Sequence, residues 1–136
     1  MPTAAELLEG RRRVLVTGGG GFIGGAVVRR LLLESDALVF NLDKMGYASD
    51  LTGIEAVLSE QGAAATSRHQ LLHVELADAD AVQQAVQQAD PDLVLHLAAE
   101  SHVDRSISGP GVFLESNVTG TYNLLQAVRT HYEGLS

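Results

Sequence analysis

Apolar runs and amphipathic segments alternate along this chain. Short runs rich in Val and Leu predict four buried strands, at residues 14–17, 37–42, 71–76 and 93–97. Apolar residues at helical spacing, with Asp78 as one N-cap, predict helices at residues 22–34, 53–59, 79–89 and 112–131. The segments 44–50 and 62–68, and the stretch through Gly109 and Pro110, are predicted to be loops. Strands that alternate with helices indicate parallel βαβ units with right-handed crossovers.

Composition narrows the class of protein. The 136 residues are 46% hydrophobic, carry a formal net charge of -8 and include no cysteine. The acidic balance argues against nucleic-acid binding, and the missing cysteines exclude disulfides and thiolate-ligated zinc. The histidines lack metal-ligand spacing, so we expect no metal site. No stretch has the apolar length of a membrane span, and residues 1–13 lack the apolar segment of a signal peptide. We expect a cytoplasmic protein in which residues 1–13 are a short extension.

A glycine-rich turn follows the first predicted strand. Within the run VTGGGGFIG (residues 16–24), Gly18, Gly21 and Gly24 have the GxxGxxG spacing and stand between a strand and a helix. Gly18 would allow the tight turn, Gly21 the approach of a pyrophosphate, and Gly24 close packing of helix on strand. The helix N-terminus would offer N–H groups and a positive dipole end to the phosphates. The alternative is an ordinary tight turn without a ligand.

Asp43 ends the second predicted strand, where a ribose-binding acid belongs. A carboxylate there can accept both ribose hydroxyls and would repel a 2′-phosphate, so NAD is favoured over NADP. The alternative is an ordinary loop acid. A P-loop is a poor alternative because no Gly-Lys-Ser/Thr follows the glycines, and Lys44 is the only lysine. The turn and the acid together predict an α/β fold of Rossmann type: a parallel sheet in the order 3-2-1-4 with helices on both faces. Residues 14–136 would form this NAD-binding domain, which stops before the later strands and the substrate domain.

A dense polar segment, HLAAESHVDRSI (residues 96–107), follows the fourth predicted strand, where open α/β sheets bind ligands. The alternative is a solvated loop. Together with VTGGGGFIG and NLDKMGYASDL, this segment resembles the N-terminal part of the dTDP-glucose 4,6-dehydratase family, in the extended short-chain dehydrogenase/reductase superfamily. The resemblance covers nearly all of residues 14–129.

The resemblance implies which residues surround an NAD cofactor. They are Gly18, Gly21, Phe22, Ile23, Gly24, Asp43, Lys44, Met45, Gly46, Glu75, Leu76, Leu97, Ala98, Ala99, Glu100, Ser101 and Ser116. Ser101 would also lie near the nucleotide-sugar substrate. Glu75-Leu76 stands where the family has Asp-Ile, which lengthens the side chain beside the adenine by a methylene. His96 and His102 are expected to be structural, hydrogen-bonding residues.

The residues that perform the family's reaction are not in this sequence. The family uses a Tyr-x-x-x-Lys pair and a Thr-Asp-Glu segment, and neither occurs here. We therefore expect no catalytic residue and no turnover from this chain alone, while the complete enzyme would be a lyase acting on dTDP-glucose in deoxysugar biosynthesis. The alternatives are a fragment of another NAD-dependent nucleotide-sugar epimerase or dehydratase, and a non-catalytic NAD-binding module. We expect no nucleic-acid or membrane partner, but a homodimer or other self-association through the open edge of the fourth strand.

Overall fold

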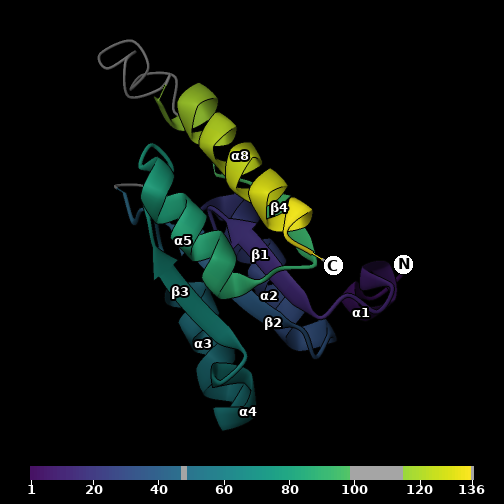
Figure 1. Cartoon of the computed structure of the whole chain (residues 1–136). Helices are drawn as coiled ribbons and strands as arrows, with labels where there is room; N and C mark the ends of the chain where they lie inside the picture. Colours follow the sequence, from purple (N-terminus) through teal and green to yellow (C-terminus); the bar gives the residue numbers. More distant parts are fainter. Residues whose placement is uncertain (47–48, 99–114, 136) are drawn as a thin grey trace.

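A four-stranded parallel sheet forms the centre of the molecule. The computed structural model describes residues 1–46, 49–98 and 115–135, without the side chains of 115 and 116. The strands are β1 (Arg13–Thr17), β2 (Leu38–Asp43), β3 (His69–His73) and β4 (Leu93–His96). They lie in the order β3-β2-β1-β4, and each neighbouring pair is parallel (Figure 1). The predicted order 3-2-1-4 is therefore confirmed.

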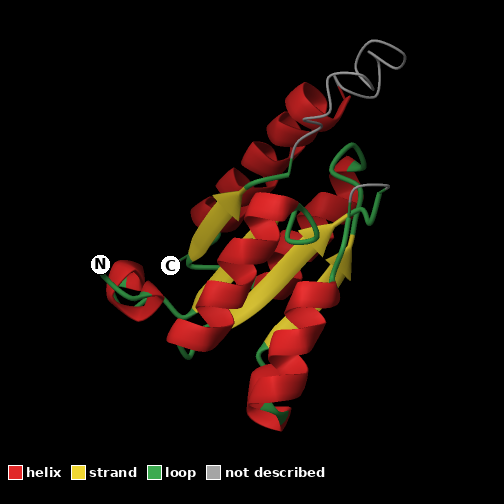
Figure 2. Cartoon of the chain, turned by 180° about the vertical axis from the view of Figure 1, so that it is seen from behind, coloured by secondary structure: helices red, strands yellow, loops and turns green. Residues whose placement is uncertain are grey.

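Helices cover both faces of this sheet. They are α1 (Ala4–Leu8), α2 (Phe22–Glu34), α3 (Thr52–Gln61), α4 (Ala63–Thr66), α5 (Ala79–Ala89) and α8 (Gly120–Glu133), the last preceded by a π-helical turn, η1 (Glu115–Thr119). Figures 1 and 2 show α2 and α3 on one face and α5 and α8 on the other. Within the described ranges, no helix is long and apolar enough to cross a membrane.

Alternation along the central strand divides the core in two. Val14 and Val16 of β1 belong to the cluster beneath α2 and α3, whereas Leu15 belongs to the cluster beneath α5 and α8. Because β1 packs into a cluster on each side of the sheet, its residues from Val14 to Thr17 are buried on both faces. This is why its sequence is a continuous apolar run.

Several segments differ from the sequence-based expectation. The segment 62–68, predicted to be a loop, contains α4, whose alanines favour a helix. The third strand was predicted at 71–76 but spans His69–His73, because it pairs with β2 from Val39↔His69 to Asp43↔His73. Residues 1–13, predicted to be an extension, include α1 and the start of β1.

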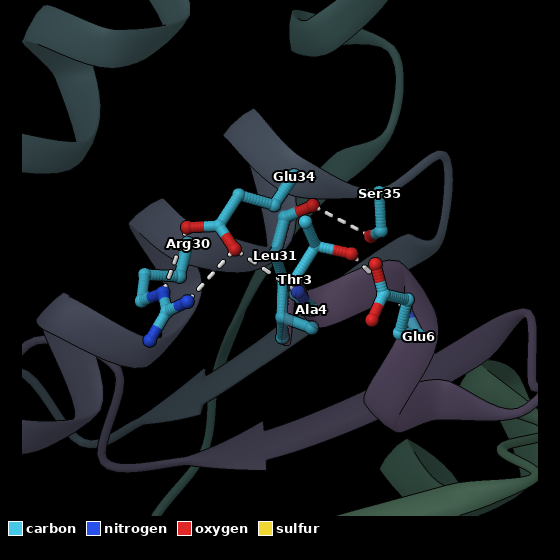
Figure 3. Close-up of polar contacts among 7 residues, drawn as sticks. All are labelled: Thr3, Ala4, Glu6, Arg30, Leu31, Glu34 and Ser35. Carbon is cyan, nitrogen blue, oxygen red and sulfur yellow. Dashed lines mark hydrogen bonds and ion pairs between the residues drawn. The ribbon is translucent and has the colours of Figure 1, made fainter. Parts of the chain in front are cut away.

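The helix α1 packs against the end of α2. Ala4 and Leu8 are buried in the core cluster beneath α2. Figure 3 shows the polar part of this contact, in which the Ala4 amide donates to Glu34 Oε1 at 3.0 Å and Arg30 forms an ion pair with the same carboxylate. The hydrogen bond from Arg30, and then that from the Ala4 amide, lowers the pKa of Glu34 from its ordinary value of 4.5 to about 2.

Candidate cofactor site

The turn between β1 and α2 contains the predicted glycines. Gly18 has φ +77°, a conformation that favours glycine, and its amide donates to Leu42 O at 2.8 Å. A Cβ at Gly18 would lie 2.7 Å from the Ala98 backbone. Gly18 therefore serves the tight turn, as predicted, and also the close approach of the chain leaving β4, which the sequence did not reveal.

The other two glycines of the motif have different surroundings. A Cβ at Gly24 would clash with the Gly18 carbonyl oxygen and lie 2.7 Å from its carbon, so the first turn of α2 packs directly on the glycine turn. A Cβ at Gly21 would meet only Gly18 O, at 3.3 Å. The protein fold therefore requires a glycine at 24 far more than at 21. Gly21 is the N-cap of α2 and supplies no side-chain cap, while Phe22 beside it is 95% exposed.

Asp43 ends β2 beside this turn and is only 6% exposed. Its Oδ2 accepts a hydrogen bond from Gly20 N at 2.8 Å. Its Oδ1 accepts from Met45 N at 2.7 Å and from Ser49 Oγ at 2.8 Å. The predicted acid therefore lies directly against the predicted glycine turn, and it also organises the start of the segment after β2.

The ends of β2 and β3 form the next part of the site. Lys44 Nζ lies 3.9 Å from Glu75 Oε2, and Lys44 O lies 3.0 Å from His73 Nε2. Glu75 is exposed, whereas the Leu76 side chain is buried in the core. Asn123 of α8 is buried and donates to Leu76 O at 2.8 Å. This anchoring role of Asn123 was not predicted from the sequence.

Thr17 links the end of β1 to the chain that leaves β4. Its buried Oγ1 accepts from Leu97 N at 3.0 Å and from Ala98 N at 3.1 Å. It also lies 2.6 Å from His96 Nδ1. Because a hydroxyl has two acceptor positions and one proton, the Thr17 proton must be donated to Nδ1. Thr17 therefore holds Leu97 and Ala98, two of the predicted cofactor-site residues, beside Gly18.

The other side of the His96 ring continues this chain of hydrogen bonds. Nε2 lies 2.9 Å from Thr121 Oγ1, which itself donates to Asn117 O at 3.1 Å. The ring proton therefore lies on Nε2, which donates to Thr121. Burial lowers the pKa of His96 below 6.5, which favours the neutral ring that this arrangement needs. His96 thus makes the structural hydrogen bonds expected of it.

Asn41 is a further buried polar residue at the site that sequence reasoning missed. It lies on β2 and is fully buried, and a Cβ at Gly19 would overlap its side-chain amide. Neither amide atom has a hydrogen-bond partner within the described part of the chain. An asparagine inside an apolar strand, directly under a glycine turn, is the one signal that could have marked it.

Several predicted residues lie in parts of the chain that the structure does not describe. Ala99, Glu100, Ser101 and His102 lie outside the described residues, as does the side chain of Ser116. The remaining predicted cofactor residues all lie at or just beyond the carboxyl ends of β1, β2, β3 and β4, or in the first turn of α2. Among the described residues, no cluster of His, Asp or Glu could hold a metal ion.

Several known proteins are similar to this chain in sequence. A dTDP-glucose 4,6-dehydratase of Shigella flexneri is 44% identical over 124 residues, and dTDP-glucose 4,6-dehydratase 1 of Escherichia coli K12 is 44% identical over 123. These alignments cover 91% and 90% of this chain but 33% and 32% of the relatives, so the chain spans about a third of their length.

Solved structures agree with the sequence comparison. DesIV, a dTDP-glucose 4,6-dehydratase from Streptomyces venezuelae solved with NAD and TYD bound, superimposes with a TM-score of 0.75 at 38% identity. The match covers 88% of this chain and 36% of DesIV. A UDP-glucose 4-epimerase from Stenotrophomonas maltophila, solved with NAD, has a TM-score of 0.75 at 28% identity over 89% of this chain and 34% of its own. The family described as GDP-mannose 4,6 dehydratase matches residues 15–135, and the chain therefore belongs to that family.

Proposed function

We propose that this chain binds NAD at the carboxyl edge of its sheet. The observation that carries the proposal is the hydrogen bond from Gly20 N to Asp43 Oδ2, because an acid at the end of β2 that contacts the glycine turn is the arrangement expected for binding a ribose and a pyrophosphate. The residues present fit a dinucleotide. Gly21 offers backbone without a side chain, the first turn of α2 has no side-chain cap, and a diphosphate would satisfy its N–H groups.

The charge of Asp43 also supports NAD over NADP. A carboxylate accepts hydrogen bonds from ribose hydroxyls but repels a 2′-phosphate, and Asp43 is too buried for water to screen that repulsion well. The adenine would lie beside the residues that follow two of the strands. These are Lys44, Met45 and Gly46 after β2, and Glu75 after β3. Leu97 and Ala98, held by Thr17, would face the nicotinamide half.

A titration with NAD tests the proposal. Asp43→Asn is expected to weaken NAD binding by about tenfold to a hundredfold, because hydrogen bonds to a charged group are lost. The same variant should narrow the preference for NAD over NADP. Asp36→Asn is the matched control, since Asp36 is an exposed acid on the loop between α2 and β2. Calorimetry that shows equal NAD affinity for the original chain, Asp43→Asn and a bulky Gly21→Leu variant would contradict the proposal.

We further propose that the complete protein is an NAD-dependent dTDP-glucose 4,6-dehydratase. Curated relatives at 41–44% identity carry that name, whereas the epimerase structures are less similar in sequence. When bound, NAD supplies a hydride acceptor at the sugar. The residues of this chain would bind and orient the dinucleotide, while the catalytic residues would lie beyond it. The absence of cysteine suits a reducing compartment such as the cytoplasm.

We also propose that the isolated chain self-associates through the edge of its sheet. Among the described strands, β4 pairs only with β1, so one of its edges presents unpaired backbone groups. Sedimentation velocity is expected to show a weight-average mass that rises with concentration. A single monomeric species at all concentrations would contradict this proposal.

A further inference from the structure

The acceptor positions of Asp43 are nearly filled by the protein itself. A carboxylate has about four lone-pair positions. Met45 N and Ser49 Oγ take two on Oδ1, at 2.7 and 2.8 Å, and Gly20 N takes one on Oδ2, at 2.8 Å. One position therefore remains, while a ribose that presents both its hydroxyls needs two.

Of the three donors to Asp43, the Ser49 hydroxyl can move away at the lowest cost in free energy. Gly20 N and Met45 N are backbone groups, fixed by the glycine turn and by the end of β2. The Ser49 hydroxyl turns about a single side-chain torsion. The backbone around it is held independently, because Ser49 N donates to Gly46 O at 3.0 Å and Asp50 N donates to Gly20 O at 2.7 Å. Loss of the hydroxyl contact would therefore leave the backbone of Ser49 and Asp50 in place.

The glycine at position 20 makes this contact possible. A Cβ there would lie 2.9 Å from Asp43 Oδ2 and 3.1 Å from Ser49 Cβ. Without that side chain, the turn, the acid and Ser49 lie in one compact group. The Ser49 hydroxyl thus takes one of the acceptor positions of Asp43.

We propose that the Ser49 hydroxyl competes with the ribose diol for Asp43 and so weakens NAD binding by this chain. The inference rests on the proposed NAD function. Binding of both hydroxyls requires the Ser49 proton to leave Oδ1, and the ribose then replaces the bond that is broken. Ser49 therefore lowers the affinity of the chain for the adenosine half of NAD, and it takes no part in any reaction.

The direction in which Ser49→Ala changes the affinity for NAD tests this competition. The variant is expected to tighten NAD binding by about threefold to tenfold, the range that one hydrogen bond of modest net strength gives. In the Asp43→Asn background the gain should shrink, because the two changes are coupled through the same group. Ser67→Ala is the matched control: Ser67 donates to Ala64 O on the exposed surface of α4. It should leave the affinity unchanged.

A second probe separates competition from a merely structural effect. ADP carries the full diol, whereas 2′-deoxy-ADP needs only one acceptor position. Ser49→Ala should tighten the binding of ADP but not that of 2′-deoxy-ADP. A structural change in the loop would alter both affinities alike, and this result would overturn the inference.

The remaining outcomes distinguish the inference from the function on which it rests. If the original chain binds NAD and Ser49→Ala binds it equally or more weakly, the competition is wrong and the NAD function stands. If neither protein binds NAD although both fold, as circular dichroism would show, the proposed function fails and the inference fails with it.

Discussion

Gly24→Ala is expected to lower the free energy of unfolding by about 3 kcal/mol. The added Cβ would overlap the Gly18 carbonyl oxygen and lie 2.7 Å from the Gly18 carbon. Both atoms are backbone, so no side-chain rotation can relieve the clash, and either α2 or the glycine turn must move. Urea unfolding followed by circular dichroism measures the loss.

The neighbouring glycine provides the matched control. A Cβ at Gly25 would lie 3.3 Å from Gly19 O and 3.4 Å from the flexible end of Arg29. In the same helix, alanine is intrinsically favoured over glycine by about 1 kcal/mol, which offsets this mild crowding. Gly25→Ala is therefore expected to change the stability by less than about 1 kcal/mol. Equal unfolding midpoints for the two variants would show that α2 does not require the contact at Gly24.

Thr17→Val is expected to destabilise the chain by about 2 kcal/mol. Valine keeps the shape of threonine but removes the hydroxyl. The Ala98 amide and His96 Nδ1 would then lose the partners they have at 3.1 and 2.6 Å, while Leu97 N keeps its bond to Thr17 O. Hydrogen exchange at the Ala98 amide should accelerate together with the loss of stability.

Thr66→Val is the control for this substitution. Its hydroxyl donates to Gly62 O on the exposed side of the short helix α4, so water can replace the bond. A change of less than about 0.5 kcal/mol is expected there. If Thr17→Val is no more harmful than Thr66→Val, the threonine–histidine hydrogen bonds do not hold the end of β4.

The sheet could be predicted because its signals are local. The run from Val14 to Val16 is apolar without interruption, and only a strand buried on both faces needs that pattern. Asp78 was predicted as an N-cap, and its carboxylate accepts from Ala81 N. The third strand was predicted too far along the chain, because its ends depend on pairing with β2. The polar residues His69 and Gln70, with which it begins, give no apolar signal in the sequence.

The site was only partly predictable for a similar reason. The glycine spacing after β1 and the acid at the end of β2 point to a dinucleotide because each stands at the carboxyl end of a strand. The roles of Thr17, Ser49 and Asn41 depend on contacts between segments far apart in the chain or bent back by the fold. The residues that flank a loop serine in the sequence do not indicate whether its hydroxyl faces water or a buried carboxylate.

The placement of α1 has a practical consequence. The helix is fastened to the last turn of α2, and Figures 1 and 2 show both labelled chain ends at the edge where the strands begin. The glycine turn and Asp43 lie at the opposite edge, where the strands end. A biotin or affinity tag attached before Met1 would therefore tether the molecule to a sensor surface with the glycine turn and Asp43 directed into solution.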